Sequence, residues 1–253
     1  MKVVFIGVIA MLAAFGLMVP ASAQNAQAGV RIFLAGDSTV SNYKPEAPQR
    51  GWGQVLDRYF NKNVTIVNLA ASGASTKTFR SIGRWDKLLS QLKPGDYVMC
   101  QFGHNDSSRD KVKAKGTDAG TEYQANLKMF IEEVKSKGAA IILVTPMHRG
   151  TFQADGKITQ DLLPYVEAMK KVAKENNITL IDIYTPSGEY LEKIGTDDIA
   201  PIFCGIKNDR THFSEKGALV MAEFVVKGIA VAKHPLAEYL KQQDNAIIKE
   251  TGR

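Results

Sequence analysis

The sequence predicts an α/β protein, a three-layer α/β/α sandwich around a five-stranded parallel sheet. Two observations predict this fold. Five short apolar runs are rich in β-branched residues and are continuous rather than alternating, which is typical of parallel strands covered on both faces. Helical patterns separate these runs, and strands that alternate with helices build such a sandwich. The predicted strands cover residues 30–35, 64–69, 97–102, 140–144 and 178–183.

Helices are predicted where apolar residues recur at helical spacing between and after the strands. The last helix is expected to begin at Ser214, a suitable N-cap, with Glu215 in its first turn, where the helix dipole favours a carboxylate. In open parallel sheets, sites lie at the carboxyl ends of the strands, so the residues that follow each strand are where chemistry is expected. The helical patterns cover residues 52–60, 127–134, 163–173 and 219–225.

The chain begins with the features of a secretory signal peptide. Lys2 gives a basic start, residues 3–19 are apolar, and Ala21 and Ala23 are the small residues that signal peptidase requires. Cleavage after Ala23 predicts a signal peptide over residues 1–23 and a secreted or periplasmic protein. An uncleaved membrane anchor is the alternative, because the apolar stretch is nearly long enough to span a bilayer.

Residues 24–253 are expected to form a single domain and a monomer. These 230 residues suit one hydrophobic core, and no internal repeat or flexible linker divides them. Loss of Lys2 lowers the formal net charge from +6 to +5, and the basic residues do not form the dense arginine runs of nucleic-acid binders. No other apolar run could cross a bilayer. Neither nucleic acid nor membrane is an expected partner of the mature chain.

The two cysteines, Cys100 and Cys204, could form one disulfide in an exported protein. Cys100 lies in a predicted strand, so the alternative is a small buried side chain with a free thiol. The sequence leaves both possibilities open.

Ser38 is the candidate nucleophile. It follows Gly36 and Asp37 directly after the first predicted strand, so the chain can turn sharply there and present the hydroxyl at the sheet edge. An isolated Gly-Asp-Ser is more often a helix cap or a turn. Because a serine hydroxyl becomes a useful nucleophile only with a base to accept its proton, the assignment depends on a partner elsewhere in the chain.

His212 is the candidate general base, because Asp209 stands three residues before it and can orient its imidazole. A surface loop histidine is the alternative. His104, at the end of the third strand, is the rival base, but no comparable carboxylate is expected behind it. His148 follows a strand and could contact substrate, although a loop role is favoured, and His234 is expected to be inert.

An ester hydrolase also needs hydrogen-bond donors aimed at the oxyanion that develops during attack. The backbone N–H groups of Ser38 and Gly73 and the side-chain amide of Asn105 are the candidates, because all three follow predicted strands. The chain has neither the Cys/His spacing of a metal site nor a phosphate-binding glycine loop. No metal, nucleotide or other cofactor is therefore expected.

Four segments resemble the signature blocks of SGNH (GDSL-type) hydrolases, in the same order. They are residues 36–39, the glycine block around Gly73, residues 103–106 and residues 209–212. Within that superfamily, residues 32–39, 51–53, 94–98 and 101–106 are similar to those of rhamnogalacturonan acetylesterases. The resemblance implies a flavodoxin-like sandwich that removes acetyl groups from pectic polysaccharide without a cofactor. It carries the family's site onto Ser38, Gly73, Asn105, Asp209 and His212.

Substrate contacts are less defined. The family often has an arginine after the glycine of the second signature block, whereas here Ala74 follows Gly73. The expected substrate-binding residues are His104, Lys77 and Arg80. With Lys44 and Arg109, the two cations would draw a uronate-bearing chain toward the cleft. Scattered solvated charges unrelated to substrate are the alternative.

Three other kinds of function remain compatible with the sequence. Another SGNH ester hydrolase could act on acetylated xylan, on a sialic acid or, as a lipase, on small lipids. The strand-end loops carry many polar residues, which favours carbohydrate over lipid. An O-acetyltransferase would use the same residues with a different acceptor. A non-catalytic carbohydrate-binding protein could share the fold, because fold alone does not fix function.

Overall fold

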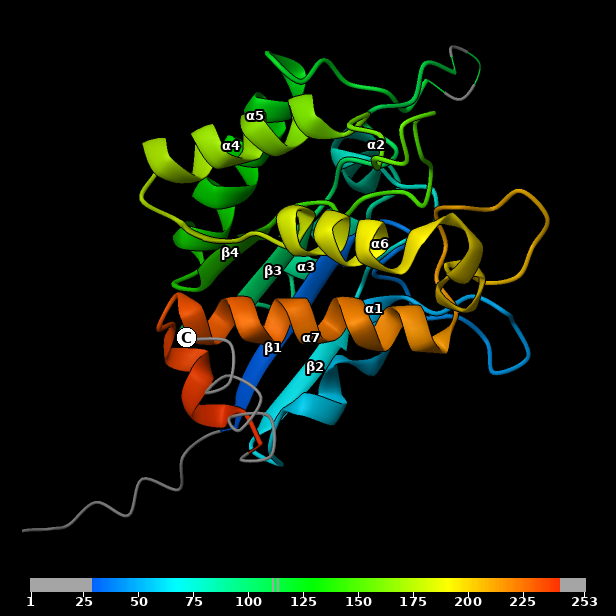
Figure 1. Ribbon diagram of the computed structural model, residues 1–253. Helices are drawn as coiled ribbons and strands as arrows, with labels where there is room; N and C mark the ends of the chain where they lie inside the picture. Colours follow the sequence, from blue (N-terminus) through cyan, green and yellow to red (C-terminus); the bar gives the residue numbers. More distant parts are fainter. Residues whose placement is uncertain (1–28, 111, 113, 242–253) are drawn as a thin grey trace, which may run out of the picture.

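The computed structural model describes residues 29–110, 112 and 114–241, and it contains the predicted sandwich (Figure 1). The five strands form one parallel sheet in the order β2-β1-β3-β4-β5. All five predicted strands are confirmed, with ends that shift by at most two residues. The predicted signal peptide at residues 1–23 lies outside the described residues. The strands are β1 Val30–Gly36, β2 Val64–Asn68, β3 Tyr97–Gln101, β4 Ala140–Val144 and β5 Thr179–Ile181.

Strand β1 lies between β2 and β3, and this order positions the site. Phe33 of β1 pairs with Val67 on one side and with Val98 on the other. The chain therefore leaves β1 toward one neighbour and later returns on the opposite side. Such a switch point opens a crevice at the carboxyl ends of the strands. In Figure 1 these ends point toward the long loops at the right of the molecule.

Helices cover both faces of the sheet (Figure 1). On one face, side chains of α1, α6 and α7 pack in a cluster with strand residues such as Leu34 and Ile142. On the other face, α2, α3, α4 and α5 pack against residues such as Phe33 and Leu143. Short 3-10 helices follow α1, α6 and α7. The α-helices are α1 Trp52–Val55, α2 Thr76–Ser81, α3 Arg84–Leu89, α4 Glu122–Ser136, α5 Leu163–Glu175, α6 Tyr184–Asp198 and α7 Glu215–Val231.

The helices differ from the prediction in two respects. The helix expected over residues 52–60 is a four-residue α1 followed by the 3-10 helix Leu56–Tyr59. Helices α2, α3 and α6 were not predicted. Two of them have only six residues, too few for a helical period to stand out, and α6 is broken by Gly195, whose φ is 77°. The expected N-cap of α7 is present, since Ser214 Oγ accepts a hydrogen bond from the Gly217 N–H.

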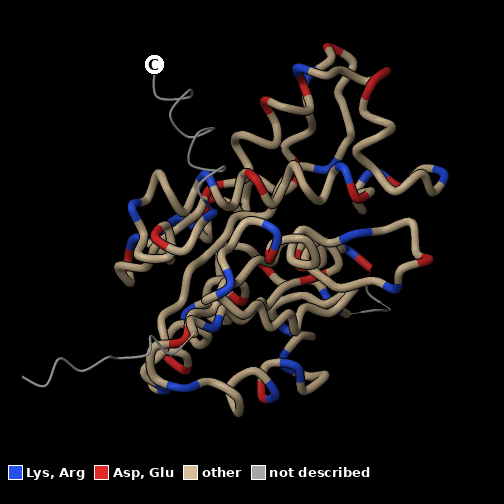
Figure 2. Tube along the Cα trace, turned by 90° about the horizontal axis from the view of Figure 1, so that it is seen from below, with Lys and Arg blue, Asp and Glu red and all other residues tan. Residues whose placement is uncertain are grey.

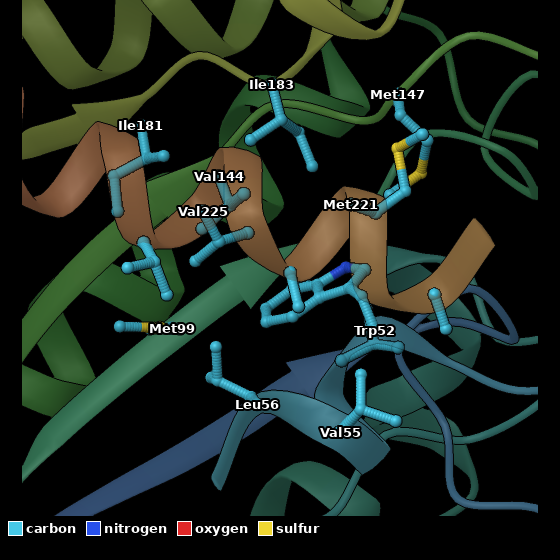
Figure 3. Close-up of a cluster of buried hydrophobic side chains, with 14 of the residues drawn as sticks. Trp52, Val55, Leu56, Met99, Val144, Met147, Ile181, Ile183, Met221 and Val225 are labelled. Carbon is cyan, nitrogen blue, oxygen red and sulfur yellow. The ribbon is translucent and has the colours of Figure 1, made fainter. Parts of the chain in front are cut away.

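Trp52 is the largest side chain in the cluster between the sheet and α7. Figure 3 shows its indole among Met99 of β3 and Met221 and Val225 of α7. Its Nε1–H donates a 2.9 Å hydrogen bond to Oε1 of Gln101, the last residue of β3. This contact ties α1 to the strand end from which the site loop departs.

Across the described residues, none of the helices combines the length and apolar character needed to span a membrane. Lysines and arginines alternate with aspartates and glutamates along the trace in Figure 2. The charged residues are thus distributed over the molecule rather than gathered on one element.

We expect Trp52→Phe to lower the free energy of unfolding by about 2–4 kcal/mol, because it leaves a gap in the cluster and removes one of the two hydrogen bonds that Gln101 Oε1 accepts. Urea denaturation followed by far-UV circular dichroism measures the change. Ile82→Ala is the control: this side chain is 56% exposed, so its loss should change stability by less than about 0.5 kcal/mol. Equal stability of Trp52→Phe and the wild type would contradict this description of the core.

Candidate active site

Ser38 lies in a tight turn immediately after β1. The N–H groups of Val40 and Ser41 both donate to the Asp37 carbonyl, which folds the chain back on itself. A Cβ at position 36 would lie 2.5 Å from Val40 Cγ2, so only glycine fits at the start of this turn. The turn holds the largely buried Ser38 at the sheet edge.

Ser38, His212 and Asp209 form a continuous hydrogen-bonded chain. His212 Nε2 lies 2.9 Å from Ser38 Oγ, and His212 Nδ1 lies 2.7 Å from Asp209 Oδ2. Because the aspartate occupies Nδ1, the other ring nitrogen faces the serine hydroxyl and can accept its proton. The three residues that the sequence analysis selected are therefore in contact, although 174 positions separate Ser38 from His212.

Asp209 is held as a carboxylate by its surroundings. Burial raises the pKa of its carboxyl, but hydrogen bonds from the backbone N–H groups of His212 and Thr211, together with the His212 side chain, outweigh burial and leave the pKa below its usual value. Both backbone donors lie 2.9 Å from Asp209 Oδ1. Oδ1 thus anchors the loop while Oδ2 orients the imidazole.

The His212 loop is fixed to the rest of the fold by its backbone. The Cys204 N–H donates to the His212 carbonyl, and the Gly150 N–H donates to the carbonyl of Arg210. Cys204 Sγ also lies 3.6 Å from Asp209 Oδ2, so the thiol is an additional contact of this carboxylate. Cys204 and Cys100 are both free and buried, and the disulfide that the sequence left open is not formed.

Asn105 and Gly73 follow the two strands that flank β1, which are β3 and β2. Asn105 follows β3, and its Nδ2 donates a 2.9 Å hydrogen bond to the carbonyl of Ala74, the residue after Gly73. Gly73 has a φ of 80°, a conformation that favours glycine. The Ala71 N–H donates to the Gly36 carbonyl, which ties the Gly73 loop to the Ser38 turn. The two candidate donors therefore belong to one hydrogen-bonded assembly with the serine turn.

His104 does have a carboxylate behind it, contrary to the sequence-based expectation. Its Nδ1 lies 3.4 Å from Asp37 Oδ2, and both side chains are buried. Burial raises the pKa of Asp37, but His104 and hydrogen bonds from Thr39 outweigh it and lower the pKa overall. The sequence could not show this pair because it depends on the register that sets Gly36 beside Gln101. The ring hydrogen-bonded to Ser38 is nevertheless that of His212.

A cavity of about 600 Å³ opens in front of Ser38. Every residue that lines it has a polar or charged side chain, so the site offers many hydrogen-bonding and charged groups. Its lysine and two arginines, Lys115, Arg149 and Arg210, were not selected from the sequence as substrate-binding residues. The other lining residues are Ser38, His104, Asn105, Ser107, Ser108, Asp161, Asn208, Asp209, Thr211 and His212.

Lys77 and Arg80, which the sequence predicts to bind substrate, do not line this cavity. Lys77 pairs with Glu122 at 3.4 Å and lines a neighbouring cavity. Arg80 pairs with Glu133 of α4 and lies over the Phe130 ring. The reason is the unpredicted helix α2, which directs these side chains toward α4.

Arg109 and Lys44, the other two cations expected to attract substrate, also lie outside the cavity at Ser38. Arg109 lines the cavity next to α2, together with Lys77, and Lys44 lines a third cavity with Asn42. His148 is buried, stacks on Tyr184 and lines a different cavity of about 220 Å³. His234 caps a 3-10 helix by accepting from the Leu236 N–H. None of these four residues contacts the triad.

The described part of the chain contains no group of three or more His, Cys, Asp or Glu side chains with the geometry to hold a metal ion.

Comparison with known proteins identifies the family. The sequence pattern of the GDSL-like lipase/acylhydrolase family matches residues 32–225. The chain belongs to this family. It is similar to a rhamnogalacturonan acetylesterase of Bacillus subtilis, at 36% identity over 85% of this chain and 96% of the relative. The resemblance seen in the signature blocks is thus confirmed, and the protein is a carboxylic ester hydrolase of the SGNH type.

Solved structures agree on the fold. The structure of the Bacillus subtilis protein YxiM superimposes with a TM-score of 0.73 at 32% identity, over 82% of this chain and 58% of that longer one. An acetylxylan esterase of Geobacillus stearothermophilus gives a TM-score of 0.62 at 22% identity, over 80% of this chain and 94% of that one. The sandwich with a five-stranded parallel sheet is therefore shared with known esterases.

Asp106 is a buried carboxyl directly behind Asn105. Burial raises its pKa to about 6, although Thr76 and Thr117 donate hydrogen bonds to it. The Thr76 hydroxyl lies 2.5 Å and the Thr117 hydroxyl 2.8 Å from Oδ1. The carboxyl thus fastens the loop after β3 to both α2 and the segment before α4.

A raised pKa means that Asp106 stabilises the fold most when protonated. Its contribution is complete below the ordinary carboxyl pKa of 3.8 and is lost as pH rises through about 6. Between pH 4 and pH 7, the free energy of unfolding of the wild type should therefore fall by about 2 kcal/mol relative to that of Asp106→Asn. Urea denaturation across this range measures the difference. Parallel pH profiles for the two proteins would contradict the assignment.

Proposed function

We propose that this protein is a secreted esterase that removes O-acetyl groups from rhamnogalacturonan through an acetyl-enzyme on Ser38. The observation that carries the proposal is that every residue lining the cavity at Ser38 has a polar or charged side chain. A fatty acyl chain requires an apolar wall, whereas a sugar requires hydrogen-bond partners. The similarity to a rhamnogalacturonan acetylesterase supports the choice of glycan, and the signal-peptide pattern at residues 1–23 supports secretion.

The proposed reaction has two steps that share one base. Ser38 Oγ attacks the acetyl carbonyl carbon while its proton passes to His212 Nε2, and Asp209 stabilises the resulting imidazolium. The bond to the sugar oxygen then breaks, and that oxygen takes the proton from His212. Water attacks the acetyl-Ser38 carbonyl and gives a proton to His212. Acetate leaves as Ser38 Oγ regains the proton, so the enzyme returns to its starting state.

Each step passes through a tetrahedral oxyanion that needs donors already in position. Asn105 lines the same cavity as Ser38, and its amide is held in a fixed orientation by Ala74. We assign Asn105 Nδ2 and the N–H groups of Ser38 and Gly73 as these donors. Fixed donors are effective because they do not have to reorganise when the charge develops.

Arg210 is the cation best suited to bind a uronate carboxylate beside the acetylated sugar. Of the cavity's other cations, Arg149 pairs with Asp161 and Lys115 donates to Asn105. The exposed Arg210 side chain forms no ion pair within the described part of the chain. Its guanidinium can therefore form two parallel hydrogen bonds with a carboxylate that approaches the serine.

Acetate release from a panel of substrates tests the proposal. We expect acetylated rhamnogalacturonan to be hydrolysed with a higher kcat/KM than acetylated xylan. Arg210→Gln should raise KM about three- to tenfold for the uronate-bearing substrate and leave a neutral aryl acetate unchanged, because one charged contact is lost. The control is Arg58→Gln, which removes an exposed arginine paired with Glu215.

Other outcomes would redirect the assignment. Preference for neutral acetylated xylan would reject rhamnogalacturonan while leaving the ester chemistry in place. Preference for long-chain acyl esters would reject the carbohydrate substrate. Transfer of acetate to a second sugar at the expense of hydrolysis would make the protein an acetyltransferase. Absence of any ester cleavage would favour a binding protein.

A further inference from the structure

Lys115 contacts the amide that we assign to the oxyanion hole. Its Nζ donates a 2.6 Å hydrogen bond to Asn105 Oδ1, and the side chain is half-buried in the lining of the Ser38 cavity. The residue belongs to the segment between β3 and α4, ten positions after Asn105. No motif in the sequence marks it.

The backbone around Lys115 is held in place on its C-terminal side. A Cβ on Gly116 would lie 2.1 Å from the Ser108 carbonyl oxygen, so the segment passes this carbonyl too closely for any other residue. The Thr117 N–H donates to the carbonyl of Asp106, and the Tyr165 hydroxyl donates to the Thr117 carbonyl. Lys115 thus lies two residues before Thr117, whose backbone is hydrogen-bonded to Asp106, the neighbour of Asn105.

The Asn105 amide is consequently fixed at both ends. Lys115 binds its oxygen, and one hydrogen of its nitrogen is directed to the Ala74 carbonyl. The second hydrogen on Nδ2 remains for a ligand in the cavity. A cation on the oxygen draws electron density from the amide, which makes the nitrogen a stronger donor, and a charge-assisted hydrogen bond is stronger than a neutral one.

We propose that Lys115 is a positioning residue of the oxyanion hole, which orients and polarises the Asn105 amide for the charge that develops on the acetyl oxygen. The inference rests on the proposed function, because it needs Ser38 as nucleophile and Asn105 as donor. Lys115 does not touch the reacting atoms in this role. Its contribution is therefore to kcat, through the transition state, rather than to the binding of substrate.

A neutral aryl acetate tests the proposal without interference from substrate charge. Removal of one oxyanion donor lowers kcat by roughly 100- to 1,000-fold. Loss of the lysine that polarises the Asn105 donor should cause a smaller decrease in kcat than loss of the donor itself. We therefore expect Lys115→Met to lower kcat about tenfold or more while KM changes less than about twofold. Lys115→Arg keeps the cation and should restore most of the activity. Lys135→Met, on the exposed face of α4 far from the cavity, is the matched control.

A double-mutant cycle separates this role from an independent one. If Lys115 acts through Asn105, the Asn105→Ala/Lys115→Met variant should have the kcat of Asn105→Ala within about twofold. Multiplicative losses would overturn the proposal. Unfolding curves of each variant show whether the fold is kept, and Lys115→Gln, which is polar but uncharged, repeats the test if the methionine variant is unstable.

Lys115 could instead bind the carboxylate of the glycan. In that case Lys115→Met would raise KM on acetylated rhamnogalacturonan and leave kcat on the aryl acetate unchanged, which would overturn the proposal. Failure of the proposed function has a different signature. Full aryl-acetate activity in Ser38→Ala would reject the nucleophile itself, whereas an inactive Ser38→Ala with an unaffected Lys115→Met would reject only the role of Lys115.

Discussion

The pairing of β1 between β2 and β3 is the constraint on which the site depends. It brings the residues that follow three different strands to one edge of the sheet, with Ser38 after β1, Gly73 after β2 and Asn105 after β3. Backbone hydrogen bonds also connect these loops to one another beyond the strand ends, such as the bond from the Ala71 N–H to the Gly36 carbonyl. His212 reaches the same edge because it lies just before α7, which begins at Glu215 and packs against this sheet.

Three buried or half-buried carboxyls support this edge, and each has different neighbours. Asp209 accepts from the loop backbone and from His212, Asp37 faces His104, and Asp106 accepts from two threonine hydroxyls. Buried carboxylates are costly unless they are paired or hydrogen-bonded. Here the hydrogen bonds and the histidine contacts offset part of this cost, and each carboxyl fixes a loop that carries a proposed catalytic group. A site that must hold donors for an oxyanion benefits from such fixed surroundings.

The sequence predicted what depends on local pattern and on the order of motifs. The five strands stand out as β-branched apolar runs, and Ser38, Asp209 and His212 follow from a turn, a spacing of three and the need for a base. The sequence could not predict contacts that depend on register or on short helices. Asp37 meets His104 only because β1 and β3 are neighbours, and Arg80 turns to Glu133 because of a six-residue helix. Lys115 was missed because its loop has no repeating pattern.

The proposed reaction depends on Ser38 as the nucleophile and on His212 as the base that activates it. A serine-directed phosphonate, followed by peptide mass spectrometry and by hydrolysis of an aryl acetate, tests both roles. We predict that Ser38 alone is modified, that activity is lost in proportion to the modification, and that His212→Ala is labelled far more slowly. Modification of another residue, or a Ser38→Ala variant that keeps more than about a tenth of the wild-type kcat, would contradict this assignment.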